Sequence, residues 1–393
     1  MYLTKEEEHV YDGEHGWANQ ISMRILAKLG DLFGASKLIP IESAHVSGVS
    51  YKTIGDAASD FLKTLADAEG KAQVRATLNP QGSDSEYLAK RLPENLIEKQ
   101  QNILNQFGRM GFTQSLTCTP YYLETPSKGS HLAWAESSAI VYANSVLGAW
   151  TNREGGPSAL ASAIIGKTPN YRVHKAENRQ PKVVVNMNAQ LRSETDFGAL
   201  GFCLGKMLED KVPLIRGLQK ASEADLKQLC AALASSGMVN MFHRELESSW
   251  KEIGKMQEIT IEAKDIKQTI ESLSTASSNK PDLVFIGCPH CSLGEIKRIA
   301  SLMKDRKVKA GMEFWVCISR YVKEKAGSYV ERIEKCGGHV LAGVCTIVSW
   351  TELLGIKTIM TNSAKTAFYA PTLNRAETIL APMTDCLNMV LQG

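Results

Sequence analysis

The C-terminal part of the chain alternates short, continuously apolar runs with longer stretches in which apolar residues recur every three or four positions. The first pattern is typical of buried strands and the second of amphipathic helices. Parallel strands need a crossover connection, usually a helix, so this alternation predicts a mostly parallel sheet. The predicted strands lie at 282–290, 313–319, 339–346 and 358–364, with helices at 292–304 and 321–335 and a closing helix after them.

A similar alternation begins near residue 180, where four β-rich runs are separated by helical patterns: KVVVNMNA, VPLIRGL, MVNMFHRE and ITIEA. Farther upstream, Thr4 and Glu7 have the spacing of a capping box and mark the start of a helix. The helices predicted in this region span 4–33, 56–68 and 137–148, and two helical stretches separated by Pro93 are predicted within 86–109. A strand near 38–46 opens into a loop.

Two polar segments, 176–181 and 275–282, are the best candidates for linkers. They divide the chain into three predicted subdomains, 1–178, 179–278 and 279–393. A chain of 393 residues exceeds the size at which a single hydrophobic core keeps growing, which agrees with such a division. The predicted fold class is therefore α/β, with several subdomains and mostly parallel, doubly wound sheets.

The composition, with 44% apolar and 22% charged residues, is that of an ordinary soluble protein. The formal net charge is only +3 and no run of basic residues occurs, which argues against a nucleic-acid partner. The first residues are acidic and lack the apolar core of a signal peptide, and no uncharged apolar stretch of bilayer-spanning length follows. We therefore expect a cytoplasmic protein without a membrane partner.

Cys118, Cys288 and Cys345 each stand where an apolar run gives way to small, turn-forming residues. Residues placed just after parallel strands face the carboxyl edge of the sheet, where ligands bind in α/β proteins. Because cysteine thiolates are the usual ligands of iron–sulfur clusters, we interpret these three residues as candidate cluster ligands.

An alternative is that these thiols are structural, since a cysteine outside a disulfide commonly packs as a small hydrophobe. The chain has nine cysteines, and the intervals between the three candidates match no local metal motif. Cys291 forms a single CxxC with Cys288, which fits a redox pair, half of a zinc site or chance. The remaining five are interpreted as structural: Cys203, Cys230, Cys317, Cys336 and Cys386.

Polar residues follow several strands predicted in the last hundred residues. Cys288, Ser319, Cys345 and the segment 362–365 all come directly after such strands. Since the carboxyl ends of parallel strands share one edge of a sheet, these residues are expected to converge on a single crevice.

The loop TNREGGPS carries Arg153 ahead of Gly155 and Gly156, with a helix predicted to start at Pro157. Backbone N–H groups at such a helix start, together with an arginine, can bind a phosphate or carboxylate. The alternative is an ordinary capped turn. The loop is not a phosphate-binding loop of the GxxxxGK[ST] type, which disfavours nucleotide hydrolysis.

A second loop places Ser47 and Gly48 just after His45, whose imidazole has a pKa suited to proton transfer but is equally suited to a structural hydrogen bond. The signatures HExxH and GxSxG are absent, which argues against a zinc or serine hydrolase. Two further loops carry mixed donors and acceptors: one has Asn79 and Asp84, and the other has Ser363 and Lys365.

Seven segments, read in order, resemble the large, catalytic subunit of the aconitase X family in its archaeal two-subunit form. They are AHVSGVSY, ATLNPQGSD, SLTCTPYY, WAESSAIVYANSVLGAWTNREGG, FIGCPHCS, GVCTIV and MTNSAKTAFYAP. The resemblance spans nearly the whole chain, and the fourth segment is long and specific. It implies an aconitase-like fold and a hydro-lyase.

The resemblance also implies a substrate, a cofactor and a partner. The archaeal members convert mevalonate 5-phosphate to trans-anhydromevalonate 5-phosphate in a variant mevalonate pathway to isoprenoids. Single-chain relatives dehydrate cis-3-hydroxy-L-proline, which is the alternative substrate. A 4Fe-4S or 3Fe-4S cluster is implied, and a separate small swivelling-domain subunit is expected as the partner in a heterodimer because 393 residues leave no room for a fused one.

By the same resemblance, Cys118, Cys288 and Cys345 become the cluster ligands. His45 is a candidate catalytic residue, and the small subunit is expected to supply the base. A non-enzymatic alternative is a scaffold or binding protein that carries the cluster without turnover. The predicted substrate-binding residues are Ser47, Gly48, Asn79, Asp84, Glu136, Ser137, Ser138, Asn144, Asn152, Arg153, Glu154, Gly155, Gly156, Ser363 and Lys365.

Overall fold

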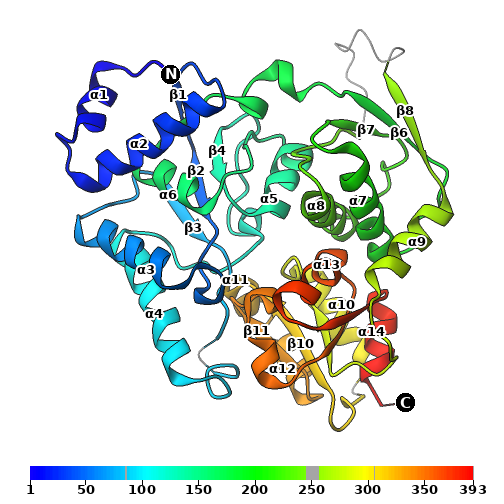
Figure 1. Cartoon of the computed structure of the whole chain (residues 1–393). Coiled ribbons are helices and arrows are strands. Elements are labelled where there is room, and N and C mark those ends of the chain that lie inside the picture. The colour runs from blue at the N-terminus through cyan, green and yellow to red at the C-terminus, as the bar shows by residue number, and fades with distance from the viewer. Residues whose placement is uncertain (85, 245–255, 305, 393) are drawn as a thin grey trace. The chain divides into compact units, whose positions relative to one another are not determined.

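The computed structural model describes residues 1–84, 86–244, 256–304 and 306–392. These residues form two compact units. Unit 1 consists of residues 1–81 and 93–180, and unit 2 of residues 82–92 and 181–393. The α/β class expected from the sequence is confirmed, because both units contain parallel sheets flanked by helices (Figure 1).

Unit 1 is built on a three-stranded parallel sheet with the order β3-β2-β4, so the middle strand has neighbours on both sides. A separate antiparallel pair joins β1 to β5. The strands are β1 (Leu38–Pro40), β2 (Ser43–Val46), β3 (Arg75–Leu78), β4 (Leu132–Trp134) and β5 (Lys167–Pro169). The α-helices are α1 (Lys5–Asp12), α2 (Trp17–Leu32), α3 (Tyr51–Asp67), α4 (Glu94–Arg109), α5 (Ser137–Tyr142) and α6 (Gly156–Ile165).

The helix predicted for residues 4–33 is in fact two helices, α1 and α2. Thr4 and Glu7 form the expected capping box at the start of α1. The break lies at Gly13 and Gly16, whose φ angles of 101° and 85° belong to the left-handed region that glycine adopts at little cost. The apolar periodicity continued through this break, so it did not mark the turn.

Unit 2 contains two parallel sheets. One has five strands in the order β11-β10-β9-β12-β13, and the other has three in the order β7-β6-β8. The predicted strand MVNMFHRE does not form over its described residues, where His243 makes only an isolated bridge with Leu214. The strands are β6 (Val183–Met187), β7 (Pro213–Ile215), β8 (Gln257–Ile261), β9 (Leu283–Ile286), β10 (Glu313–Ile318), β11 (His339–Ala342), β12 (Thr358–Thr361) and β13 (Glu377–Leu380).

Helices cover both sheets of unit 2, and α7 and α8 lie side by side (Figure 1). Glycines on α7 allow this close packing, since a Cβ on Gly201 would collide with the carbonyl oxygen of Leu229. No helix in the described part of the chain has both the length and the apolarity to cross a bilayer. The helices are α7 (Glu194–Leu208), α8 (Glu223–Ser236), α9 (Ala263–Leu273), α10 (Leu293–Met303), α11 (Arg320–Lys325), α12 (Gly327–Lys335), α13 (Ala364–Leu373) and α14 (Met383–Val390).

The short segment 82–92 belongs to unit 2, although it interrupts the sequence of unit 1. Tyr87 donates a hydrogen bond of 2.5 Å to Glu313 on β10 and stacks on His339 at 3.8 Å between ring centroids. Arg91 adds an ion pair with Glu313 at 2.9 Å. These contacts hold the segment against the edge of the five-stranded sheet at β11 and β10.

We expect Gly201→Ala to lower the free energy of unfolding by about 1–3 kcal/mol, because the added methyl group overpacks the α7–α8 contact. Chemical denaturation followed by circular dichroism measures the change. Gly327→Ala is the matched control, because a Cβ there meets nothing within 4 Å. Equal stability of the Gly201→Ala variant and the wild-type protein would contradict the packing described.

Candidate active site

The carboxyl edge of the three-stranded sheet in unit 1 gathers several residues predicted to bind substrate. β2, β3 and β4 are parallel and paired in register, so the loops that follow them leave from the same edge. Ser47 follows β2, Asn79 follows β3, and Glu136 comes two residues after β4. Polar side chains from three separate loops therefore meet at this edge.

A chain of hydrogen bonds joins His45, Asn79 and Glu136 across this edge. The Asn79 amide Nδ2 donates to Glu136 Oε2 at 2.8 Å, so Asn79 Oδ1 is the atom that faces His45 Nε2, also at 2.8 Å. His45 Nε2 must then carry the proton, and Nδ1 accepts from the Thr77 hydroxyl at 2.7 Å. Both ring nitrogens of His45 are therefore used within the chain.

His45 is completely buried. Burial lowers the pKa of His45 from 6.5 to about 4, because removal from water disfavours the charged imidazolium. The side chain is therefore neutral near neutral pH. This geometry suits the positioning of Asn79 and Glu136, and a catalytic role for His45 stays a prediction.

Glu136 also caps the next helix, α5. Its second oxygen, Oε1, accepts from the backbone N–H of Ser138 at 3.2 Å and from the Ser138 hydroxyl at 2.8 Å. Ser137 begins the helix and is partly exposed. The structure thus brings together Asn79, Glu136, Ser137 and Ser138, four of the residues predicted to contact substrate.

The two glycine-containing loops of unit 1 lie against each other. A Cβ on Gly156 would be 2.6 Å from the carbonyl oxygen of Ser47, so only glycine permits this approach. Gly48 has a φ of 80°, in the left-handed region. Helix α6 begins at Gly156, and its first turn is therefore next to the loop that follows β2. The Ser47–Gly48 and Gly155–Gly156 loops form one surface, as an anion site at this edge requires.

Three other predicted substrate residues, Glu154, Asn152 and Asn144, form hydrogen bonds inside the chain. Glu154 accepts hydrogen bonds from Ser158 at 2.5 Å and Thr168 at 3.1 Å, and burial raises its pKa. Asn152 donates to the carbonyl of Tyr171 at 3.0 Å.

Asn144 bonds both backbone polar groups of Thr151 at 2.8 and 3.0 Å. Together with Asn152 and Glu154 it holds in place the loop from which the partly buried Arg153 extends. Substrate contact by these three residues remains a prediction.

Cys118 lies near the same edge of unit 1. The backbone N–H of Thr117 donates to the carbonyl of Leu78 at 2.9 Å, and Thr113 forms a parallel bridge with Thr77. The segment that leads to Cys118 thus runs beside β3 and ends where Asn79 begins the next loop. The Cys118 side chain is buried, with 9% of its surface exposed.

Cys288 and Cys345 occupy corresponding places in unit 2. Cys288 comes two residues after β9, Cys345 comes three residues after β11, and β10 lies between these strands. The pKa of Cys345 is raised to about 12, first by burial and then by the nearby Cys288 thiol, whereas Lys365 acts in the opposite direction. The two thiols and Lys365 therefore interact within one region of unit 2.

Two further thiols lie close by. Cys317, on β10, is fully buried and its pKa is raised well above the usual value, first by burial and then by Cys345, Cys291 and Cys288. Burial likewise raises the pKa of Cys291. Among the residues that the structure describes, no three His, Cys, Asp or Glu side chains are grouped in a way that could hold a metal ion. The predicted ligands are divided, with Cys118 in unit 1 and the other two in unit 2.

The other predicted residues of unit 2 lie at turns and helix starts. Ser363 caps α13 by accepting from the backbone N–H of Thr366 at 3.3 Å. Asp84 accepts from two backbone N–H groups, those of Tyr87 at 3.0 Å and Leu88 at 2.7 Å. Asp84 therefore shapes the turn in segment 82–92, while Asn79 of the same predicted loop belongs to unit 1.

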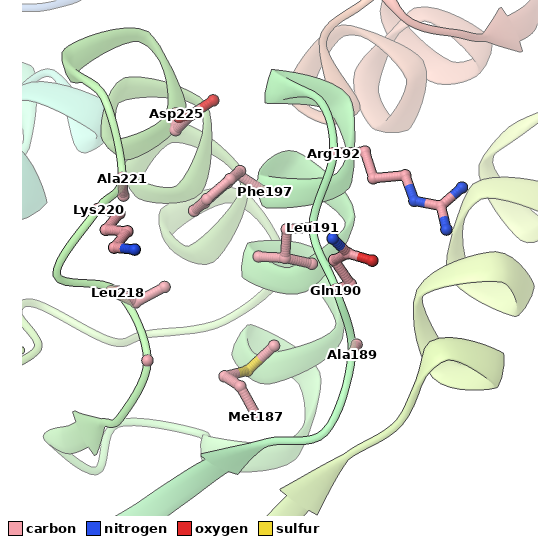
Figure 2. A pocket seen from close by; sticks show the side chains of 11 residues that line it. Met187, Ala189, Gln190, Leu191, Arg192, Phe197, Leu218, Lys220, Ala221 and Asp225 are labelled. Carbon is pink, nitrogen blue, oxygen red and sulfur yellow. The ribbon is translucent and has the colours of Figure 1, made fainter.

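A pocket that the sequence analysis missed lies at the carboxyl ends of β6 and β7 in unit 2, with a volume of about 360 Å³ (Figure 2). The sequence could have indicated this pocket, because β6 and β7 were both predicted and ligands commonly bind beyond the carboxyl ends of parallel strands. The lining residues are Met187, Ala189, Gln190, Leu191, Arg192, Phe197, Gly217, Leu218, Lys220, Ala221 and Asp225.

The chemistry of this pocket does not favour an anion. The starts of α7 and α8 are already capped by Ser193 with Asp196 and by Ser222 with Asp225, which place carboxylates at both helix N-termini. In Figure 2 the Arg192 side chain points away from the Asp225 side of the pocket. We therefore assign no anion to this pocket.

Sequence signatures of one family match three successive parts of the chain: aconitase X first domain over residues 1–177, second domain over 181–271 and third domain over 281–392. The chain belongs to the aconitase X family. The resemblance inferred from sequence motifs is thus confirmed. The crystal structure of Thermococcus kodakaraensis aconitase X (holo-form) is 41% identical, with a TM-score of 0.92 over 99% of this chain and 100% of that one.

Relatives in this family are named as dehydratases. The phosphomevalonate dehydratase large subunit of Methanocaldococcus jannaschii is 45% identical over 98% of this chain and 99% of the relative. That of Methanosarcina mazei is 42% identical over 100% and 98%. The cis-3-hydroxy-L-proline dehydratase of Pseudomonas aeruginosa is 31% identical over 100% of this chain but only 70% of its own length. The chain is accordingly a hydro-lyase of the aconitase X family.

The buried, neutral His45 predicts a pH dependence of stability. Its pKa is lower in the folded protein, so the unfolded state binds the extra proton as the pH falls, and stability is lost between about pH 6.5 and 4. The shift corresponds to about 3 kcal/mol. In His45→Gln we expect a flatter fall of the unfolding free energy across this range, measured by urea denaturation at several pH values.

The exposed His15 provides the control, since His15→Gln is expected to retain the wild-type dependence on pH. A His45→Gln variant that lost stability with falling pH as steeply as the wild-type protein would contradict the assignment of a neutral, buried imidazole.

Proposed function

We propose that the chain is the large, catalytic subunit of a phosphomevalonate dehydratase, which removes water from mevalonate 5-phosphate to give trans-anhydromevalonate 5-phosphate. The observation that carries this proposal is the similarity, at 37–45% identity over 94–100% of the chain, to five proteins of that name. The wording "large subunit" supports a small subunit as partner. An archaeal, cytoplasmic setting in the mevalonate pathway is part of the same proposal.

The reaction removes a weakly acidic proton next to a carboxylate and expels hydroxide, so the site has to stabilise charge at two places. At the start of α6, the Gly155 N–H donates to the Ser158 hydroxyl at 3.0 Å and Pro157 has no N–H, so we propose the N–H groups of Gly156 and Ser158 for the anion. Gly156 lies against Ser47. With Arg153 and the Ser47–Gly48 loop, this helix start supports binding of a carboxylate or phosphate in unit 1. We include Lys365 of unit 2 among the residues proposed to bind an anion.

His45 and Ser138 fix the orientation of Asn79 and Glu136. Beyond these bonds, the Asn79 amide has a second N–H and the Glu136 carboxylate has further lone pairs. We propose that this row orients the substrate. Because each member is held by a neighbour, the row is ordered before substrate arrives, which lowers the cost of binding.

The cysteines are suited to an iron–sulfur cluster by their chemistry. Buried thiols such as Cys345 resist ionisation, so a bound cationic centre is the natural compensation for their thiolate form. We propose Cys118, Cys288 and Cys345 as ligands of a 4Fe-4S or 3Fe-4S cluster. An iron with an open position, when bound, supplies a Lewis acid for the oxygen of the departing hydroxyl.

Two other functions compete with this proposal. Relatives named cis-3-hydroxy-L-proline dehydratase are 30–31% identical and longer than this chain, so the match to the phosphomevalonate enzymes is stronger. A scaffold that carries the cluster without turnover would need the cysteines, but it would not need Asn79 and Glu136 to be ordered for substrate binding.

The substrate assignment predicts activity of the anaerobically purified complex of this chain with its small subunit. Mevalonate 5-phosphate is expected to lose water, and unphosphorylated mevalonate to react far more slowly, as followed by mass spectrometry. cis-3-Hydroxy-L-proline is the comparison substrate. A complex with iron bound that dehydrates the hydroxyproline and not the phosphorylated acid would reject the proposal, and one inactive on all three would favour the scaffold.

The ligand assignment predicts that Cys118→Ser, Cys288→Ser and Cys345→Ser each lose most of the bound iron, because loss of one thiolate opens the cluster to solvent. Iron and sulfide analysis with the visible absorption spectrum measures this loss. Cys203→Ser, at a partly exposed position on α7, is expected to retain iron. If Cys291→Ser lost iron and Cys288→Ser retained it fully, the ligand would be Cys291 and the assignment of Cys288 would be wrong.

A further inference from the structure

A buried ion pair lies beneath the loop that carries Cys288. Lys227, on α8, has only 1% of its surface exposed and pairs with Glu295 on α10. Its ammonium group also donates to the carbonyl of His290 at 2.9 Å. Glu295 in turn accepts from the backbone N–H of Ser292 at 2.8 Å. Burial of two charges is costly, and here both charges bind the backbone of the same loop.

The next residue of α8 holds the same loop at a second point. Gln228 is 2% exposed, and its side-chain amide donates to the carbonyl of Cys288 at 3.1 Å. Two consecutive helix residues thus fix two carbonyl groups, those of Cys288 and His290. Because a helix is rigid, the backbone on either side of Pro289 is held at a set distance from α8.

His290 connects this loop to the one that carries Cys345. Its Nε2 lies 2.8 Å from the carbonyl oxygen of Val344, the residue just before Cys345. A carbonyl can only accept, so Nε2 carries the proton. His290 is 1% exposed, and the bond is shielded from water. The hydrogen bonds therefore run from α8 to the Cys288 loop and from there to the Cys345 loop.

The preceding helix makes the equivalent contact with the loop after β12. Glu194, in the first turn of α7, accepts from the side chain of Asn362 at 3.3 Å, and the Thr195 hydroxyl donates to the carbonyl of Asn362 at 3.1 Å. α7 and α8 thus hold separate loops at the carboxyl edge of one sheet. Glycines in the contact between α7 and α8, such as Gly201 and Gly205, bring the two helices close together.

We propose that Lys227, Gln228 and His290 are positioning residues that hold Cys288 and Cys345 as a preformed pair of cluster ligands. The inference rests on the proposed function, since it takes these cysteines as ligands. None of the three residues needs to contact iron or substrate. Groups that orient metal ligands in this way commonly change metal affinity 10–100-fold when they are removed.

The test compares two replacements of His290 in the complex with the small subunit. His290→Phe keeps a ring but removes the donor to Val344, whereas His290→Gln keeps a donor. We expect His290→Phe to lose iron to a chelator about 10–100-fold faster than the wild-type complex and to have an altered electron paramagnetic resonance spectrum. His290→Gln is expected to restore both toward the wild-type values.

A matched control separates positioning from general stability. Lys167→Met removes a partly buried ion pair with Glu7 in unit 1, at 2.6 Å, and is expected to lower stability without changing the rate of iron loss or the spectrum. Lys227→Met removes the corresponding pair in unit 2 and is expected to change both. Thermal denaturation of each variant shows whether it is folded.

Hydrogen–deuterium exchange of the metal-free complex gives a second readout. The backbone N–H of Cys291 donates to the carbonyl of Cys317 at 3.0 Å, and we expect it to exchange faster in His290→Phe while the strand β10 keeps its protection. A folded His290→Phe variant with wild-type exchange, iron loss and spectrum would overturn the proposal. A wild-type complex that binds no iron would instead contradict the proposed function, and exchange alone would then decide on the positioning.

Discussion

Parallel pairing of short strands is the constraint on which the rest of this molecule depends. In each sheet, pairing in one direction sends every following loop out at the same edge. Ser47, Asn79 and Glu136 are far apart in the sequence, yet they leave β2, β3 and β4 together. Cys288 and Cys345 are brought into one region of unit 2 by the same rule. The site chemistry is thus a consequence of strand direction more than of any local motif.

The elements that sequence reasoning located correctly are those with a local signal. Continuous apolar runs marked β9 and β10, because strands buried on both faces need no polar positions. The wrong predictions concern elements whose structure depends on backbone conformation or on partners far away in the sequence. Gly13 and Gly16 divide one predicted helix without disturbing its apolar period. The run near His243 is mostly apolar because it is buried, although its described residues form only an isolated bridge with Leu214.

The same distinction applies to the candidate site. The sequence indicates which loops meet, but not whether a polar side chain faces a ligand or a neighbour in the chain. Glu154 and Asn152 are used by Thr168 and Tyr171, partners that no spacing rule would suggest. Lys227 is the clearest case, because a lysine on an amphipathic helix is normally expected in solvent, and only the tertiary structure places it under the Cys288 loop.

The placement of residues 82–92 in unit 2 has a consequence for synthesis of the chain on the ribosome. Tyr87 is translated 226 residues before Glu313, its hydrogen-bonding partner. At about 5–20 residues per second, about 10–50 s pass between synthesis of Tyr87 and synthesis of the strand it packs against. During this time residues 1–81 and 93–180 of unit 1 can associate, while the segment between them has not yet found its packing partner. Nascent protein is therefore expected to expose Tyr87 and Arg91 until translation is nearly complete. Segment 82–92 is then a site at which chaperones can bind or proteases can cleave the nascent chain.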